Sequence, residues 1–337
     1  MIRRFGMMST SAAAIAIAAV AVAPVAGQGS APKLAAKAAA KNYTPARTPW
    51  GDPDLQGIYT NKDENGIPIE KPSQFEGKKL EDVDDSEFAE IVRARNEASV
   101  ARAPGIGGAD TGAGPVHWYE HYDAKNSRPW LVVDPADGKI PPTTPEAQKR
   151  AADRAAARAS HGPADSYEDR SLYDQCITRG LPGSMMPAIY GNAYQIVQGP
   201  GYVAIRYEMI HEARVIPLDG RSHVGKSIGL DMGDARGHWD GDTLVVETTN
   251  FKQRSTYRNA RAETFRLVER FKPVGHNQVE WSVTLDDPAT WTRPWTYAMN
   301  LTRGGPAQQP FEYACHEGNY GLQNMLNVAR QGEREVR

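Results

Sequence analysis

The chain has 337 residues, of which 40% are hydrophobic and 24% are charged, and its formal net charge is −2. This near balance of charges excludes general electrostatic binding to nucleic acid or to an anionic membrane surface. Two cysteines are too few for a disulfide-dense scaffold or for a four-cysteine zinc or iron–sulfur site.

Residues 1–27 are predicted to be an export signal. Arg3 and Arg4 precede an alanine-rich apolar run at 11–26, and small residues follow it. A positive start, a short apolar core and a small-residue exit are typical of a secretory signal. The alternative is a transmembrane anchor, but the run is short and mostly alanine. We therefore expect a periplasmic or secreted mature chain without a membrane span, with both general-secretory and twin-arginine export left open.

The rest of the chain is predicted to form a spacer followed by a single domain. Residues 28–50 include a low-complexity alanine–lysine stretch and are expected to be a flexible spacer. Residues 51–337 form the domain, with helical insertions expected at about 81–102 and 145–175. The second insertion begins with Pro145 after two threonines, which are candidate helix caps, and its arginines are interpreted as a solvated face.

Hydrophobic residues alternate with polar ones from Tyr194 onward, which indicates β-strands. Residues 202–210, 243–249, 265–272, 279–285 and 297–301 each show this period of two. Turns rather than long helices separate these segments, so the strands are expected to pair antiparallel. The predicted fold class is mainly β, an antiparallel lipocalin-like barrel with N-terminal helical and irregular decorations.

Long motifs carry a resemblance to a family of exported bacterial proteins without an established activity. They include DPDLQGIYTN at 52–61, EMIHEARVIPLDGR at 208–221, GHWDGDTLVVETTNF at 237–251 and YACHEGNY at 313–320. A looser resemblance to lipocalin-type barrels rests on Gly57, Ile58 and Tyr59. The resemblance implies export and a barrel, and it implies no particular reaction.

Cys176 and Cys315 are predicted to form a disulfide, because an exported chain meets an oxidising compartment. The bond would close a loop of 139 residues and stabilise the fold by about 5 kcal/mol in the chain-entropy model. Two separate buried thiols are the alternative.

Histidines and acids in turn-rich segments are the candidate catalytic residues, because an imidazole beside a carboxylate can transfer a proton near neutral pH. We expect such groups to gather at the mouth or inner wall of the barrel. The candidates are His211, His223, His316, Glu208 and Glu317.

Arginines and aromatic residues near the same motifs are the candidate substrate-binding residues. They are Arg214, Arg221, Trp291, Trp295 and Tyr320. Glu269 lies on an otherwise apolar strand face, where a carboxylate needs a partner, and Arg206 is the predicted partner in a structural ion pair.

A metal site is a second interpretation of the histidines, because imidazole and carboxylate ligands suit zinc, iron or copper. The spacings match no compact ligand motif, and His117 and His121 lack the His-Glu-x-x-His order. We therefore predict no metal ligands and no cofactor.

The predicted function is that of an exported enzyme acting on a small organic substrate by histidine–carboxylate acid–base chemistry, as a lyase, isomerase or hydrolase. The alternative is a non-catalytic periplasmic binding protein for a small hydrophobic or aromatic ligand, and a structural envelope protein is a third possibility. The expected partner is a small molecule, not nucleic acid.

Overall fold

The computed structural model describes residues 43–84, 86–90, 93–94, 120, 128–305 and 308–335. The predicted signal at 1–27 and most of the predicted spacer lie outside these residues. The part of the spacer that is described contacts the barrel, because Arg47 forms an ion pair with Asp242 at 2.5 Å and Thr48 is buried.

Ten strands of the described chain form one sheet, in the order β5-β4-β3-β1-β10-β9-β8-β7-β6, with β2 beside β10. The strands are β1 (Gly57–Thr60), β2 (Val132–Asp134), β3 (Ala193–Gly199), β4 (Tyr202–Tyr207), β5 (Ala213–Pro217), β6 (Asp234–Asp240), β7 (Thr243–Thr249), β8 (Arg266–Gly275), β9 (Gln278–Asp286) and β10 (Trp295–Arg303). Every pairing between these named strands is antiparallel. The predicted fold class is confirmed.

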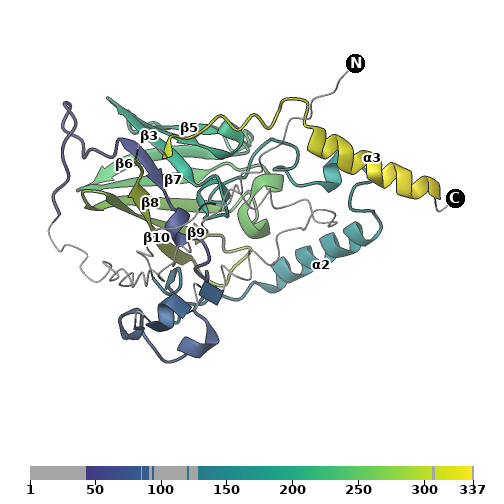
Figure 1. Cartoon of the computed structure of the whole chain (residues 1–337), viewed down its shortest axis with the longest axis horizontal. Helices are drawn as coiled ribbons and strands as arrows, with labels where there is room; N and C mark the ends of the chain where they lie inside the picture. Colours follow the sequence, from purple (N-terminus) through teal and green to yellow (C-terminus); the bar gives the residue numbers. More distant parts are fainter. Residues whose placement is uncertain are drawn as a thin grey trace, which may run out of the picture. The chain divides into compact units, whose positions relative to one another are not determined.

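The sheet curls into a nearly closed barrel (Figure 1), in which the two end strands, β5 and β6, lie close together. Gly237 on β6 is the contact point. A Cβ atom there would lie 2.9 Å from Cγ2 of Ile216 and 2.7 Å from Cδ2 of Leu218. Only glycine therefore lets the end strands approach this closely.

Aromatic and aliphatic side chains fill the interior face of the strands. Trp281, Trp295 and Tyr297 are all fully buried, and the Tyr297 ring centroid lies 5.8 Å from that of Trp281 and 6.0 Å from that of Trp295. No histidine is among the buried side chains that the structure describes, which do not include that of His211. The described interior is a packed core of aromatic and aliphatic side chains.

Two long helices of the described chain accompany the barrel. Helix α2 (Pro145–Ala159) begins where predicted, and the Thr144 side chain caps it by accepting a hydrogen bond from the backbone N–H of Ala147 at 3.1 Å. Helix α3 (Tyr320–Glu335) is held by Arg330, which donates to the backbone oxygen of Asp165 at 2.6 Å. Both helices lie to the right of the strands in Figure 1.

The first helical insertion is described only in part. Residues 86–90 are helical and a short 3-10 helix, Leu80–Asp82, precedes them, whereas most of 91–102 lies outside the described residues. Within the described ranges, no helix combines the length and the apolar character that crossing a membrane requires.

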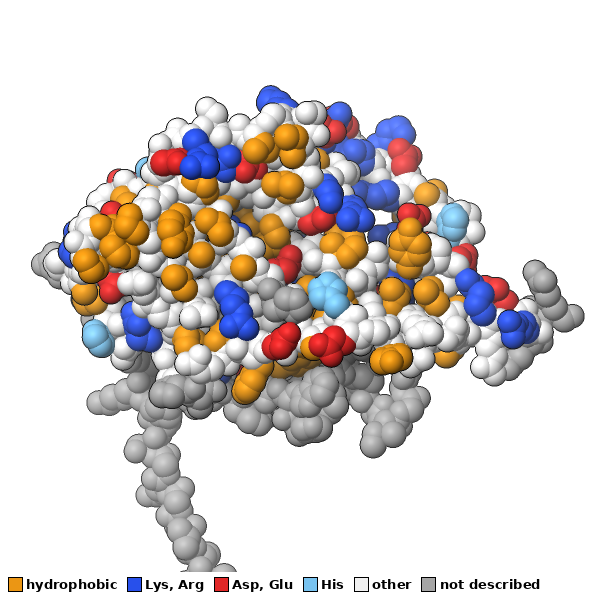
Figure 2. Space-filling view, turned by 90° about the horizontal axis from the view of Figure 1, so that it is seen from above, with side chains coloured by type: hydrophobic (Ala, Val, Ile, Leu, Met, Phe, Trp, Pro, Cys, Tyr) orange, Lys and Arg blue, Asp and Glu red, His pale blue; other side chains and the backbone are white. Residues whose placement is uncertain are grey.

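The surface separates by side-chain type. On the face shown in Figure 2, hydrophobic side chains gather mainly over the left part and many Lys and Arg side chains gather at the upper right. Exposed apolar residues on the outer face of the sheet include Val197, Tyr202 and Val215.

Candidate ligand-binding site

A pocket of about 1140 Å³ lies at one end of the barrel. This is the end at which β4 and β7 finish and β3 and β8 begin. Three connections build the pocket: the segment from α2 to β3, the short link between β4 and β5, and the link between β7 and β8. Residues far apart in sequence therefore meet around one space.

Arginine is the dominant charged residue of this pocket. The lining arginines are Arg154, Arg158, Arg170, Arg179, Arg254 and Arg258. Glu168 is the one carboxylate among the described lining residues. The pocket consequently carries a large excess of positive charge in a chain whose overall charge is close to zero.

Only two of these arginines have ion-pair partners among the described residues. Arg170 pairs with Asp174 at 3.2 Å, and Arg254 pairs with Asp231 at 3.4 Å. The other four, Arg154, Arg158, Arg179 and Arg258, form no ion pair within the described part of the chain.

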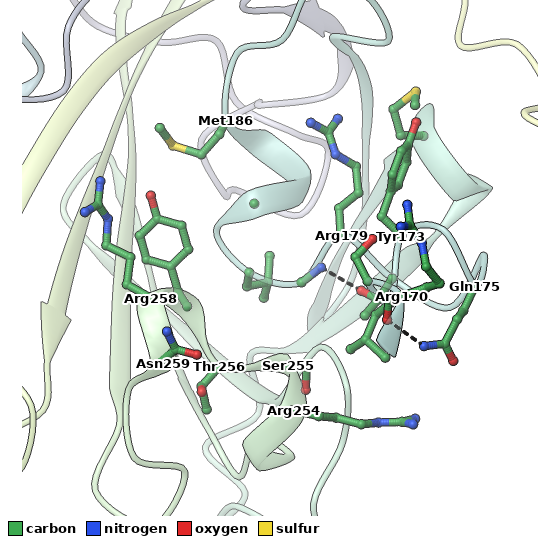
Figure 3. Close-up of a pocket in the computed structure, with 18 of the residues that line it drawn as sticks. Arg170, Tyr173, Gln175, Arg179, Met186, Arg254, Ser255, Thr256, Arg258 and Asn259 are labelled. Carbon is green, nitrogen blue, oxygen red and sulfur yellow. Dashed lines mark hydrogen bonds between the residues drawn. The ribbon is translucent and has the colours of Figure 1, made fainter. Parts of the chain in front are cut away.

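Two of the four arginines without a carboxylate partner among the described residues lie over tyrosine rings at cation–π distance. The guanidinium carbon of Arg179 lies 5.6 Å from the centroid of the Tyr173 ring, and that of Arg258 lies 5.7 Å from the Tyr257 centroid. Figure 3 shows Arg258 on one side of the pocket and Arg179 with Tyr173 on the other. Stacking on an aromatic face orients a guanidinium without using its N–H donors.

Local backbone geometry places Arg258 in an uncommon conformation. Arg258 and Asn259, in the 3-10 helix η10 (Tyr257–Asn259), have φ values of 50° and 62°. Ile210, which follows the lining residue Met209, has φ of 59°, an outlier for a β-branched residue. Such strain concentrates at functional sites, where the surrounding structure compensates for it.

The predicted disulfide between Cys176 and Cys315 is confirmed, with the Cα atoms 5.6 Å apart. It holds the segment that precedes α3 against the pocket wall, where the hydroxyls of Tyr173 and Tyr313 lie 3.2 Å apart. Burial and the neighbouring Tyr313 hydroxyl raise the pKa of Tyr173, and burial also raises the pKa of Tyr190. These hydroxyls therefore stay protonated and can donate hydrogen bonds.

Glu212 lies directly behind the pocket wall. Its Oε2 accepts hydrogen bonds from the backbone N–H of Arg179 at 3.3 Å and from the hydroxyl of Ser184 at 3.1 Å. Burial raises the pKa of Glu212, and hydrogen bonds from Thr178, Arg179 and Ser184 offset only part of this effect. A carboxyl group with a raised pKa beside a pocket is suited to proton transfer.

His223 lies beside carboxylates, as the sequence suggested, but they belong to Asp234 and Glu247 and not to the predicted Glu208 or Glu317. Its Nδ1 lies 2.9 Å from Asp234 Oδ2, and its Nε2 lies 3.4 Å from Glu247 Oε1. Burial raises the pKa of Asp234, but hydrogen bonds from Val224, His223 and Arg236 outweigh this and lower it. This cluster is not part of the pocket lining.

The other predicted catalytic residues are dispersed. Glu208 Oε2 accepts a hydrogen bond from the backbone N–H of Ala193 at 3.1 Å, and burial raises its pKa. His316 and Glu317 have exposed side chains, and His211 ends the 3-10 helix η8 (Met209–His211), with its side chain outside what the structure describes. The described pocket lining includes none of these residues.

The predicted substrate-binding residues also lie apart from the pocket. Trp291 and Trp295 are core residues whose ring centroids lie 5.7 Å apart. Arg221 is exposed and donates to Asp219 at 2.8 Å, and Tyr320 is 70% exposed at the start of α3.

Arg214 is the buried partner of Glu269, so the prediction of Arg206 in that role is wrong. Arg214 donates two hydrogen bonds to the Glu269 carboxylate, at 2.6 and 2.8 Å, and Trp281 Nε1 donates a third at 3.0 Å. Register explains the exchange, because Arg214 pairs with the interior residue Ile205, and Arg206 follows Ile205 on the opposite face of β4.

Sequence reasoning missed the pocket because its arginines come from segments without strand periodicity. One signal was present: Arg154 and Arg158 are four residues apart on α2, so like charges adjoin on one helix face. Such repulsion destabilises a helix, so a pair of like charges at this spacing can indicate a functional role.

The parts of the chain that the structure describes contain no group of three or more His, Cys, Asp and Glu side chains placed to hold a metal ion. His117 and His121 are outside those parts. No protein-family model, curated protein or solved structure matches the chain.

Proposed function

We propose that this protein binds a small organic anion in the arginine pocket. The supporting observation is that four lining arginines have no ion-pair partner among the described residues, while the lining contributes one carboxylate. A guanidinium presents its N–H groups as a fork that matches a carboxylate with two parallel hydrogen bonds. Apolar lining side chains such as Leu172, Ile189 and Met186 suit the organic part of the ligand.

Binding is proposed to take place outside the cytoplasm. The disulfide supports this, because such bonds persist in oxidising compartments, and the N-terminal sequence has the organisation of an export signal. In the periplasm or outside the cell, the pocket would meet small molecules taken up from the environment.

A comparison of benzoate with its neutral analogue benzamide tests the proposal. Titration calorimetry on the oxidised mature chain should show benzoate binding at least about tenfold more tightly, an advantage of about 1.4 kcal/mol. The double variant Arg179→Met/Arg258→Met should remove the advantage, whereas Arg221→Met, which changes an exposed arginine away from the pocket, should keep it. Equal binding of the two probes, or no binding of either, would contradict the proposal.

Acid–base catalysis at this pocket is the second candidate function. Glu212 favours it, because its carboxyl group lies directly behind the pocket wall, where it accepts a hydrogen bond from the backbone N–H of the lining residue Arg179, and burial raises its pKa. The histidine–carboxylate chemistry predicted from the sequence, with His211, His223 or His316, remains a proposal in the same class.

Following a bound ligand over time distinguishes catalysis from binding without reaction. An anion that binds is incubated with the protein, and its proton NMR spectrum is recorded. New resonances that appear with the native chain but not with Glu212→Gln would support catalysis. A ligand that stays unchanged would favour the non-catalytic binding protein.

A further inference from the structure

Two arginine–tyrosine pairs face the pocket from different parts of the chain. Arg179 and Tyr173 belong to the segment between α2 and β3, and Arg258 and Tyr257 belong to the link between β7 and β8. The separation between guanidinium and ring is nearly the same in the two pairs, at 5.6 and 5.7 Å. The pocket thus has two similar cationic positions, one on each side (Figure 3).

Each pair is arranged to receive an anionic group. The guanidinium lies over the tyrosine ring, and its N–H groups have no carboxylate partner among the described residues. A single carboxylate satisfies the fork of one guanidinium, so one carboxylate leaves the second position without a counterion. Two anionic groups would neutralise both.

Apolar side chains form part of the pocket lining, beside polar ones such as Thr256 and Asn259. Met186 lies between Arg258 and Arg179 in the view of Figure 3, and Leu181 and Met209 also contribute to the lining. Such side chains pack against a hydrocarbon chain or an aromatic ring and offer no hydrogen bonds to a polar linker. Methionine in particular adapts to ligand shapes.

We infer that the pocket takes a dicarboxylate, a ligand with an apolar chain or ring in the middle and one carboxylate at each end. Arg179 binds one carboxylate and Arg258 binds the other. This inference rests on the proposed function, since it specifies which organic anion the arginine pocket accepts.

A ligand series tests the spacing directly. Straight-chain dicarboxylates from succinate to sebacate, together with terephthalate, are titrated into the oxidised mature chain, each beside the monocarboxylate of the same length. We expect affinity to peak at one chain length and to exceed that of the matched monocarboxylate at least about tenfold. Affinity that is independent of length, or equal for mono- and dicarboxylates, overturns the inference.

Variants show whether the two arginines hold the two ends. Arg179→Met and Arg258→Met should each reduce dicarboxylate affinity to that of the monocarboxylate, and Arg221→Met should leave it unchanged. Unchanged dicarboxylate affinity in both pocket variants overturns the assignment. If monocarboxylates bind through the arginines without any dicarboxylate advantage, this inference fails and the proposed function survives; if no carboxylate binds, both fail.

Gly183 provides a steric control that leaves the charges in place. It lines the pocket, and a Cβ atom there would meet no other atom within 4 Å. Gly183→Trp should therefore fold normally, fill part of the pocket and lower the affinity for long dicarboxylates more than for succinate. Native affinity across the series in a folded Gly183→Trp protein would place the binding elsewhere and overturn the inference.

Discussion

Arg214 in the barrel interior is buried and Arg179 in the pocket wall is half-buried, and of the two only Arg214 has a carboxylate partner among the described residues. Burial alone lowers the pKa of Arg214, and the adjacent Glu269 carboxylate more than reverses this, so the guanidinium stays charged. Arg179 is half-buried and rests on a tyrosine ring instead. The buried arginine is neutralised by a carboxylate, whereas the arginine in the pocket wall is left without one, where an anion from solution can reach it.

The largest expected effect comes from removing one side of the interior pair. Arg214→Met leaves the Glu269 carboxylate buried with Trp281 as its remaining described donor. We expect a loss of about 3–5 kcal/mol in the free energy of unfolding, measured by urea denaturation at neutral pH. The double variant Arg214→Met/Glu269→Leu should recover much of this loss because it leaves no unpaired charge.

A single variant as stable as the double variant would show that the buried charge is not the cause. Arg221→Met serves as the matched control, because it removes an arginine from an exposed pair with Asp219 and should leave the free energy of unfolding almost unchanged.

The disulfide should affect the pocket more than the barrel. Replacing Cys176 and Cys315 with serine should cost about 2–4 kcal/mol of stability. Native-state hydrogen exchange should quicken in residues 167–190, which form the pocket wall, and stay unchanged in β8 and β9. Reductant should reproduce this pattern in the native chain and have no effect on the serine variant; uniform acceleration across the barrel would contradict the local role.

Pocket arginines should contribute little to stability. Arg179→Met and Arg258→Met remove charges that have no described ion-pair partner, so each should change the free energy of unfolding by no more than about 0.5 kcal/mol. A loss as large as that of Arg214→Met, measured by the same urea titration, would show that the two arginine environments are alike. The double variant Arg179→Met/Arg258→Met should be slightly more stable than the native chain under urea, because it relieves the repulsion among the pocket arginines.

Period-two patterning explains why the barrel was predictable. The alternation at 279–285 corresponds to β9, and the segment starting at Tyr202 corresponds to β4, which ends at Tyr207. Each strand carries its own signal, because alternate side chains face the core. The disulfide was also predictable, since a chain with two cysteines allows only one pairing.

The pocket was not predictable in the same way. Its wall comes from the segment before β3 and from the link between β7 and β8, which have no regular period and are far apart in sequence. The partner of Glu269 was missed for a related reason: choosing Arg214 over Arg206 requires the register between β4 and β5. Register and loop docking are long-range properties that a single sequence does not display.

The smallest effect, and the one with a definite sign, concerns Glu212. Burial raises its folded-state pKa above the ordinary value of 4.5. The protonated form is therefore favoured by folding, so Glu212 costs no stability below about pH 4.5 and destabilises the native state as the pH rises through the folded pKa. Glu212→Gln should consequently be more stable than the native chain at pH 7, and this advantage should disappear near pH 4.

Urea titrations at several pH values measure this difference, with the exposed Glu317→Gln as the control. If a pocket guanidinium neutralised Glu212 as Arg214 neutralises Glu269, its pKa would fall and the sign would reverse. The native chain would then gain stability over the variant as the pH rises. The slope of the stability difference against pH thus shows whether a pocket arginine is paired with Glu212 or is available to bind an anionic ligand.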